Sequence, residues 1–298
     1  MVELQKIATE QRNPNTMNID TLSTLDMVKL INREDHRVAD AVGLVTDKIA
    51  QAVDVIADCL AKGGRLIYCG AGTSGRLGIL DAVECPPTYS TDPEMVQALM
   101  AGGYGAIFKA VEGAEDSKNL GVEDMRNIAF CKKDVLVGIA ASGRTHYVLG
   151  CMEYAKKLGA PTISVTCCPG SELDRFADIG IAPAPGPEVV TGSTRMKSGT
   201  AQKMVLNMLS TGAMIKLGKV YGNLMVDVKP SNEKLVRRCV TIVCSAAECS
   251  EAEAAAALEK CGYRPKVAIV MVLRGVDAET ACRMLQAAGG RVAKVLEG

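Results

Sequence analysis

Short apolar runs alternate with segments of helical periodicity through the middle of the chain. Each run is apolar at successive positions and is bounded by glycine, proline or polar residues, which predicts buried strands. Apolar strands that are separated by helices are typical of a parallel sheet covered on both faces. We therefore predict an α/β fold with a doubly wound, five-stranded parallel sheet. The predicted strands are 65–69, 96–101, 134–141, 161–167 and 179–184, and the predicted helices are 76–84, 115–128, 147–158 and 198–217.

Less regular patterns flank this region. Residues 1–20 show no periodicity, and we expect a loosely held tail there. The capping pattern at Ser23-Thr24-Leu25-Asp26 predicts the start of a first helix. From Val38 an apolar stripe predicts one long helix that stops at Gly63-Gly64.

The C-terminal part changes in composition. The pattern of residues 219–229 predicts an extended or irregular segment, and a helix is predicted from Pro230 to about Ser245. The Ala- and Leu-rich remainder predicts a small three-helix module with short, glycine-containing turns. We expect three parts: an N-terminal tail with helices at 1–55, the α/β domain at 56–220, and a linker with the helical module at 221–298.

Composition excludes several classes of function. The 298 residues carry 34 basic and 34 acidic side chains and no Trp, so nucleic acid is not an expected partner. No apolar run reaches the roughly 20 residues of a membrane span, and the N-terminus lacks a signal-peptide pattern. Twelve cysteines without a C-x-x-C pair fit a reduced, cytoplasmic protein. With only two isolated histidines, we predict neither a metal site nor another cofactor.

Three loops combine glycine with hydroxyl side chains at the start of a predicted helix. The first, Gly70-Ala71-Gly72-Thr73-Ser74-Gly75, follows the first strand, and the second, Ala141-Ser142-Gly143-Arg144-Thr145, follows the third. The third loop is 191–200, TGSTRMKSGT. Glycine lets the backbone approach a ligand closely, and a helix N-terminus offers free N–H groups to an anion. Because the loops gather at the carboxyl edge of one parallel sheet, they predict a site for a phosphorylated small molecule.

These motifs resemble a known family. GAGTSGRLG and AASGRT resemble the sugar isomerase (SIS) family of phosphosugar-binding domains. More narrowly, DAVECPPT, GGYGAIFKAVEGAEDS, TGSTRMKSGTAQK and YGNLMVDV are similar to the N-acetylmuramic acid 6-phosphate etherase family, over nearly the whole chain from about Leu22. The resemblance implies that residues 56–220 form an SIS domain. The residues expected to bind substrate are Thr73, Ser74, Gly75, Ser142, Gly143, Arg144, Thr145, Ser193, Thr194, Arg195 and Lys197.

Two glutamates stand in the matching motifs. Pro86-Pro87 predicts the end of a helix just after Glu84, where the helix dipole favours the protonated form of an acid. Glu115 stands in the first turn of a predicted helix, where acids are also ordinary stabilisers. From the residues alone, both could be plain surface acids. The resemblance implies instead that Glu84 and Glu115 are the catalytic pair.

The implied reaction removes D-lactate from C3 of N-acetylmuramic acid 6-phosphate by elimination, and hydration then leaves N-acetylglucosamine 6-phosphate. In this scheme Glu115 is the base at C2, Glu84 is the acid at the departing oxygen, and Arg195 or Lys197 pairs with the lactyl carboxylate. A non-catalytic phosphosugar-sensing regulator and an aldose–ketose phosphosugar isomerase remain alternatives, since neither needs both glutamates.

The spacing of the acid and the first loop raises a geometric question. Glu84 follows Gly75 by nine residues, a helical rise of about 13 Å, which a hexose does not span easily. Either the helix is short and bent, or Glu84 serves the pocket of a neighbouring subunit. We favour the second and predict a homodimer with sites at its interface.

Overall fold

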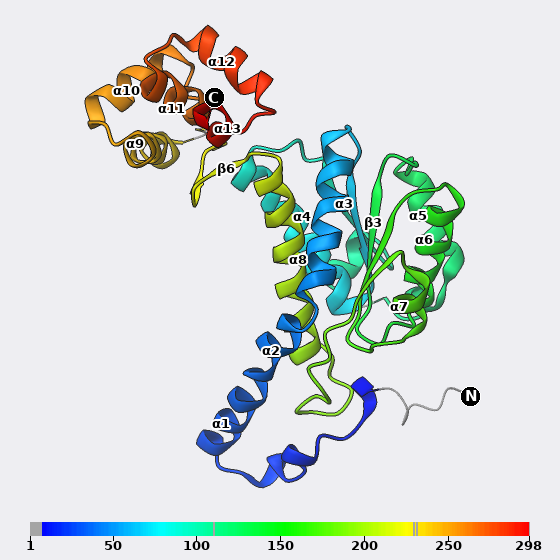
Figure 1. The fold of residues 1–298 in the computed structure, drawn as a ribbon. Coiled ribbons are helices and arrows are strands. Elements are labelled where there is room, and N and C mark those ends of the chain that lie inside the picture. Colours follow the sequence, from blue (N-terminus) through cyan, green and yellow to red (C-terminus); the bar gives the residue numbers. More distant parts are fainter. Residues whose placement is uncertain (1–7, 110, 229, 231, 298) are drawn as a thin grey trace. The chain divides into compact units, whose positions relative to one another are not determined.

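A five-stranded parallel sheet organises the first of two units into which the chain divides (Figure 1). The computed structural model describes residues 8–109, 111–228, 230 and 232–297. The first unit contains the chain up to Ala82 together with Glu94–Ser210, and the second contains Val83–Pro93 and the chain from Thr211.

The strands are β1 (Leu66–Gly70), β2 (Val96–Met100), β3 (Val135–Ile139), β4 (Thr162–Val165) and β5 (Ile179–Ile181). Their order in the sheet is β2-β1-β3-β4-β5, and each neighbouring pair is parallel. The predicted α/β class and all five predicted strands are confirmed. The carboxyl ends of β1 and β3 are adjacent, so the loops after them share one edge of the sheet.

Helices pack on the sheet through alternate side chains of its central strands. Ile67 and Cys69 of β1 belong to the buried cluster formed with α5 (Lys118–Asn127) and α6 (His146–Lys157). Tyr68, between them, points the other way, toward α4 (Gly72–Tyr89), because successive strand residues face opposite sides. At Gly78 of α4, an added Cβ would lie 3.0 Å from the Cβ of Tyr68, so glycine permits this close packing.

The helices before the sheet differ from the prediction at one point. α1 (Thr24–Asp35) begins as predicted, and Ser23 Oγ accepts a hydrogen bond from the backbone N–H of Asp26. The single long helix predicted from Val38 is wrong, since α2 (Arg37–Gly43) and α3 (Thr46–Ala61) are separate helices. The break follows Gly43, a poor helix former, and leaves Leu44 89% exposed, outside the buried stripe.

The N-terminal segment is also more ordered than predicted. Residues 8–20, expected to be a loose tail, form short 3₁₀ turns whose Thr9, Asn13 and Thr16 side chains are buried. Asn13 Nδ2 donates to the carbonyl of Pro187, and Thr16 Oγ1 donates to that of Val189. These long-range bonds hold the segment on the first unit, whereas residues 1–7 lie outside the described residues.

The second unit confirms that the C-terminal part is helical, but with one helix more than predicted. A short hairpin, β6 (Val220–Tyr221) with β7 (Leu224–Met225), precedes α9 (Glu233–Ala247). Four helices rather than the predicted three follow α9 in the described residues: α10 (Glu251–Lys260), α11 (Pro265–Arg274), α12 (Ala278–Ala287) and α13 (Val292–Glu297). Their buried apolar side chains form one core with Val226. None of the described helices is both long enough and apolar enough to cross a lipid bilayer.

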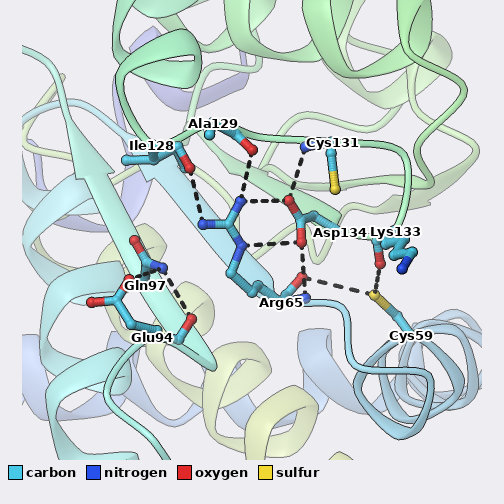
Figure 2. Close-up of polar contacts among 9 residues, drawn as sticks. All are labelled: Cys59, Arg65, Glu94, Gln97, Ile128, Ala129, Cys131, Lys133 and Asp134. Carbon is cyan, nitrogen blue, oxygen red and sulfur yellow. Dashed lines mark hydrogen bonds and ion pairs between the residues drawn. The ribbon is translucent and has the colours of Figure 1, made fainter.

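An ion pair at the amino edge of the sheet joins the half-buried Arg65, just before β1, to the buried Asp134, just before β3 (Figure 2). Arg65 Nη2 lies 2.7 Å from Asp134 Oδ2, and Arg65 Nε donates to Asp134 Oδ1 at 3.1 Å. The guanidinium also donates to the carbonyls of Ile128 and Ala129. Burial raises the pKa of Asp134, but its hydrogen bonds from Arg65 and Cys131 outweigh burial and hold the pKa below the usual value.

Replacing Asp134 by Asn should lower the free energy of unfolding by about 3 kcal/mol, because it leaves the Arg65 guanidinium without its counter-charge in a largely buried site. Urea unfolding measures this. Glu153→Gln, in the exposed pair with Lys118, should cost less than about 1 kcal/mol and is the matched control.

The pH dependence of this difference has a definite sign. Because the folded-state pKa of Asp134 is lowered, the stabilisation is complete above the ordinary aspartate pKa and declines as the pH falls toward the lowered value. If the difference in unfolding free energy between wild type and Asp134→Asn does not decrease in acid, this assignment is contradicted.

Candidate functional site

The turn between β1 and α4 brings a helix N-terminus to the carboxyl edge of the sheet. An added Cβ on Gly70 would lie 2.7 Å from the backbone N of Gly75, and one on Gly75 would lie 2.8 Å from the carbonyl O of Gly70. Both positions therefore require glycine. α4 starts at Gly72 and has no acidic side chain in its first turn, so its N–H groups and positive dipole end are not neutralised there.

A cavity of about 210 Å³ connects this turn with one of the predicted catalytic acids. Glu115 lines it from one side and Gly72 from another, although they are 43 positions apart in the sequence. Arg76 also lines the cavity and ties down the segment after β2, since it donates hydrogen bonds to the carbonyls of Ala106 and Ile107 at 2.8 Å each. The start of α4 and the Glu115 carboxylate thus line one space. The lining residues are Ala71, Gly72, Arg76, Met100, Ala101, Ala106, Val111, Glu112, Gly113 and Glu115.

The second loop lies next to the Glu115 segment. Gly143 has a positive φ of 66°, and its missing Cβ leaves room for the Ser171 hydroxyl. Thr145 is the N-cap residue of α6 and makes no side-chain capping bond, and Arg144 is exposed. His146 Nδ1 lies 4.0 Å from a carboxylate oxygen of Asp116, the residue after Glu115. Ser142, Gly143, Arg144 and Thr145 are therefore close to the acid's segment, although they do not line the cavity.

The third loop is built differently from the expectation. The carboxylate of Glu188 accepts hydrogen bonds from the backbone N–H groups of Lys197 and Ser198, at 2.9 Å each. These are the first two positions at the start of α8 (Lys197–Lys216) that an external anion would use. A buried side chain of this chain thus occupies the anion position, while Ser193 and Thr194 are half-buried in the preceding turn.

Lys197 is a structural cation in this arrangement. Its side chain is 0% exposed, and its Nζ lies 2.7 Å from Oε2 of Glu34. Burial raises the pKa of Glu34, but hydrogen bonds from Lys197, Asn13 and Asn15 outweigh burial and lower the pKa to about 2. Lys197 therefore holds α1 and the N-terminal segment to the start of α8 and has no surface to offer a substrate, whereas Arg195 is exposed.

The start of α8 nevertheless contacts the first loop. Ser74 Oγ donates a hydrogen bond to Oε1 of Gln202 at 2.9 Å, and both side chains are buried. An added Cβ on Gly199 would lie 3.4 Å from the Thr73 methyl group, which places the two segments in van der Waals contact. The structure thus places Thr73 and Ser74 against α8. Neither they nor Gly75 line the cavity, which the same loop reaches through Ala71 and Gly72.

Glu84 lies inside α4 rather than at its end. The prediction that Pro86-Pro87 stops the helix is wrong, because α4 continues through both prolines to Tyr89. Each proline removes one backbone donor from the helix, and the helix tolerates these losses for one more turn. Glu84 is exposed and belongs to the second unit, whereas Glu115 belongs to the first.

Several residues of the site were not predicted. Arg76, Gln202, Glu188 and Glu34 all make defined contacts at or behind the loops. Arg76 could have been predicted from the sequence, because it is a cation directly after the glycine-rich turn. Glu34 and Glu188 could not, because their partners are 163 and 9 positions away and nothing in a single sequence pairs them. Among the described residues, no group of three His, Cys, Asp or Glu side chains could hold a metal ion.

Comparison with protein families matches three parts of the chain. Residues 48–156 match the N-terminal SIS domain of glucokinase regulatory protein, and residues 122–212 match the SIS domain. Residues 222–272 match the C-terminal lid domain of glucokinase regulatory protein.

Close relatives cover nearly the whole chain. An N-acetylmuramic acid 6-phosphate etherase of Photorhabdus laumondii is 58% identical over 96% of this chain and 95% of its own. Etherases of the same name from Aliivibrio fischeri and Clostridium beijerinckii are 56% and 55% identical, each over 99% of this chain and over 98% and 97% of their own. Among solved structures, a protein described as a phosphosugar isomerase involved in capsule formation, from Bacteroides fragilis, aligns with a TM-score of 0.50 at 21% identity. It covers 66% of this chain and 94% of its own, which supports the fold.

Lys197→Met should lower the free energy of unfolding by about 3 kcal/mol, because it removes the buried cation of the Glu34 carboxylate and leaves only the exposed Arg37, whose Nη1 lies 3.9 Å from Oε2. Adding Glu34→Gln should recover much of the loss. The stabilisation from Glu34 is complete above the ordinary glutamate pKa and is lost as the pH falls toward 2. Arg195→Met, at an exposed neighbour, is the control and should change stability by less than about 0.5 kcal/mol. If Lys197→Met and Arg195→Met unfold with the same free energy, Lys197 has no structural role.

Proposed function

This chain belongs to the N-acetylmuramic acid 6-phosphate etherase family, and from that premise we propose that it is a lyase that cleaves the D-lactyl ether of N-acetylmuramic acid 6-phosphate. The products are D-lactate and N-acetylglucosamine 6-phosphate, which places the reaction in the recycling of cell-wall amino sugars. The observation that carries the proposal is the cavity shared by Glu115 and the N-terminus of α4. Twelve free cysteines suit a reducing compartment, and we expect the chain to act in the cytoplasm.

The phosphate is the substrate's anchor in this proposal. Thr73, Ser74 and Gly75 surround the start of α4, whose backbone N–H groups point along the helix axis toward an anion. Ser142, Gly143, Arg144 and Thr145 supply a second set of donors beside the Glu115 segment. Arg195 remains the candidate partner of the lactyl carboxylate, since the Lys197 side chain is fully buried. Binding energy from the phosphate then holds C2 and C3 of the sugar near the carboxylates.

Glu115 is the proposed base. In the open-chain sugar, C2–H is adjacent to the C1 aldehyde and is therefore acidic enough for a carboxylate to remove. Its electrons form the C2–C3 double bond as the C3–O bond breaks, and the lactate oxygen takes a proton. Water then adds its hydroxyl at C3 and its proton at C2, which restores the sugar. The C3–O bond broken in the elimination is thus replaced by the C3–OH bond formed in the hydration, and Glu115 takes and returns the proton at C2.

Glu84 is the proposed acid for the departing lactate oxygen, in the site of a second copy of the chain. α4 extends beyond it, so the helix is not cut short to bring Glu84 back toward its own loop. Leu80 and Val83 near it are 42% and 58% exposed, and Leu80 and Glu84 share one helix face. Exposed apolar side chains beside an acid fit a face that another protein surface covers. We therefore propose a homodimer with sites at its interface.

The two alternatives fit less well. A phosphosugar-sensing regulator would use the loops but has no need for an acid in the cavity, and an aldose–ketose isomerase would use a base without a leaving-group acid. Relatives of 55–58% identity over nearly the full chain carry the etherase name, which favours the lyase.

Glu115→Gln should lower kcat for lactate release by about 10²–10⁴ and abolish exchange of the C2 proton with deuterated water, because the amide cannot accept the proton. D-lactate release and NMR of the sugar measure the two effects. Glu112→Gln is the matched variant, since Glu112 lines the same cavity, and it should retain exchange. Exchange that survives Glu115→Gln but not Glu112→Gln would reverse the assignment.

Subunit mixing tests the shared site. When Glu84→Gln and Glu115→Gln proteins exchange subunits freely, half of the dimers are mixed, and one of their two sites has both glutamates. About a quarter of wild-type activity should then return. As a control, Glu84→Gln mixed with the doubly substituted protein should stay inactive. No recovery in the first mixture, with exchange demonstrated, would place both glutamates of a site on one chain or dismiss Glu84.

A further inference from the structure

A buried amide with an unused donor lies directly behind the first loop. Gln202 is 1% exposed, and its Oε1 accepts the hydroxyl proton of Ser74. Its Nε2 is buried and has no hydrogen-bond partner in the described part of the chain. A buried donor without an acceptor costs free energy, and such groups in folded proteins call for an explanation.

The direction of this hydrogen bond matters for anion binding. A serine hydroxyl has one proton to donate and lone pairs that accept. While Ser74 donates to Gln202, it presents only lone pairs to the loop, and these repel the oxygens of a phosphate. In this arrangement the Ser74 proton is therefore not available to an anion at the loop.

Rotation of the Gln202 amide by 180° about its terminal bond reverses this direction. The rotation exchanges Oε1 and Nε2 without changing the shape of the side chain. Nε2 then donates to Ser74 Oγ, and the Ser74 proton is free to point at the ligand. Nε2 gains an acceptor and Oε1 gives up its donor, so the number of bonds between the two side chains is unchanged while an anion gains the Ser74 proton.

The backbone around Gln202 supports such a role. Gly199, one turn earlier on α8, contacts Thr73, so the helix face that carries Gln202 abuts the first loop. Ser210 and Lys203 of α8 lie near the buried Asp81 of α4, at 3.1 and 4.0 Å, and hold the two helices together in the first unit. These contacts hold α8 against the first loop, so only the terminal amide group of Gln202 has to rotate.

We propose that Gln202 is a positioning residue for phosphate recognition, and that its amide turns to donate to Ser74 when a sugar phosphate binds. The inference rests on the proposed function, because it takes the first loop as the phosphate site. It assigns Gln202 no contact with the reacting atoms.

The test compares affinities for N-acetylglucosamine 6-phosphate, measured by calorimetry. In Gln202→Glu the carboxylate can only accept, so the Ser74 proton stays turned away and affinity should fall at least about tenfold. Gln202→Met removes the amide at similar size and should weaken binding less. Unphosphorylated N-acetylglucosamine, bound however weakly, should show the same affinity for every variant.

A double-variant cycle separates positioning from packing. Since Gln202 acts through Ser74, Gln202→Met should change affinity little when Ser74→Ala is already present, and kcat should change less than KM in the single variant. Wild-type affinity in Gln202→Glu, or full additivity of Gln202→Met and Ser74→Ala, would overturn the proposal. A wild-type protein that binds the sugar phosphate but releases no lactate would instead refute the proposed function alone.

Discussion

The backbone contact between Gly70 and Gly75 is the constraint on which the site depends. No side chain larger than hydrogen fits at either position, because each Cβ would collide with the other residue's backbone. The contact folds the end of β1 directly into α4 and leaves the positive end of that helix at the carboxyl edge of the sheet. The cavity with Glu115, the packing of Thr73 on Gly199 and the Ser74–Gln202 bond are all arranged around this turn.

The three similar loops of the sequence have different roles in the structure. The first reaches the cavity through Ala71 and Gly72, and the second is followed by His146, which lies 4.0 Å from Asp116, the residue after Glu115. The third is internally neutralised, since Glu188 occupies the helix start and Lys197 is committed to Glu34. The third loop therefore offers no open helix start to a phosphate, unlike the start of α4.

Local patterns predicted the parts of the fold that local physics determines. The strands are buried apolar runs, and the loops at their ends were found from glycine and hydroxyl residues. Glu115 was found only through resemblance to a family, because an acid in a first helical turn is ordinary in itself. α4 continues through Pro86 and Pro87 against the local signal of the two prolines. The buried Glu34–Lys197 pair joins residues 163 positions apart and had no local signal. The break after Gly43 had one, but the apolar stripe on both sides concealed it.

The central claim is that the turn at Gly70–Gly75 holds the substrate's phosphate and so places C2 at Glu115. The most direct measurement compares kcat/KM for N-acetylmuramic acid with and without its 6-phosphate, and adds inorganic phosphite to the unphosphorylated sugar. If the claim holds, loss of the phosphate lowers kcat as well as affinity, and phosphite in the empty anion site restores part of the rate. Equal kcat/KM for the two sugars, with no effect of phosphite, would contradict it.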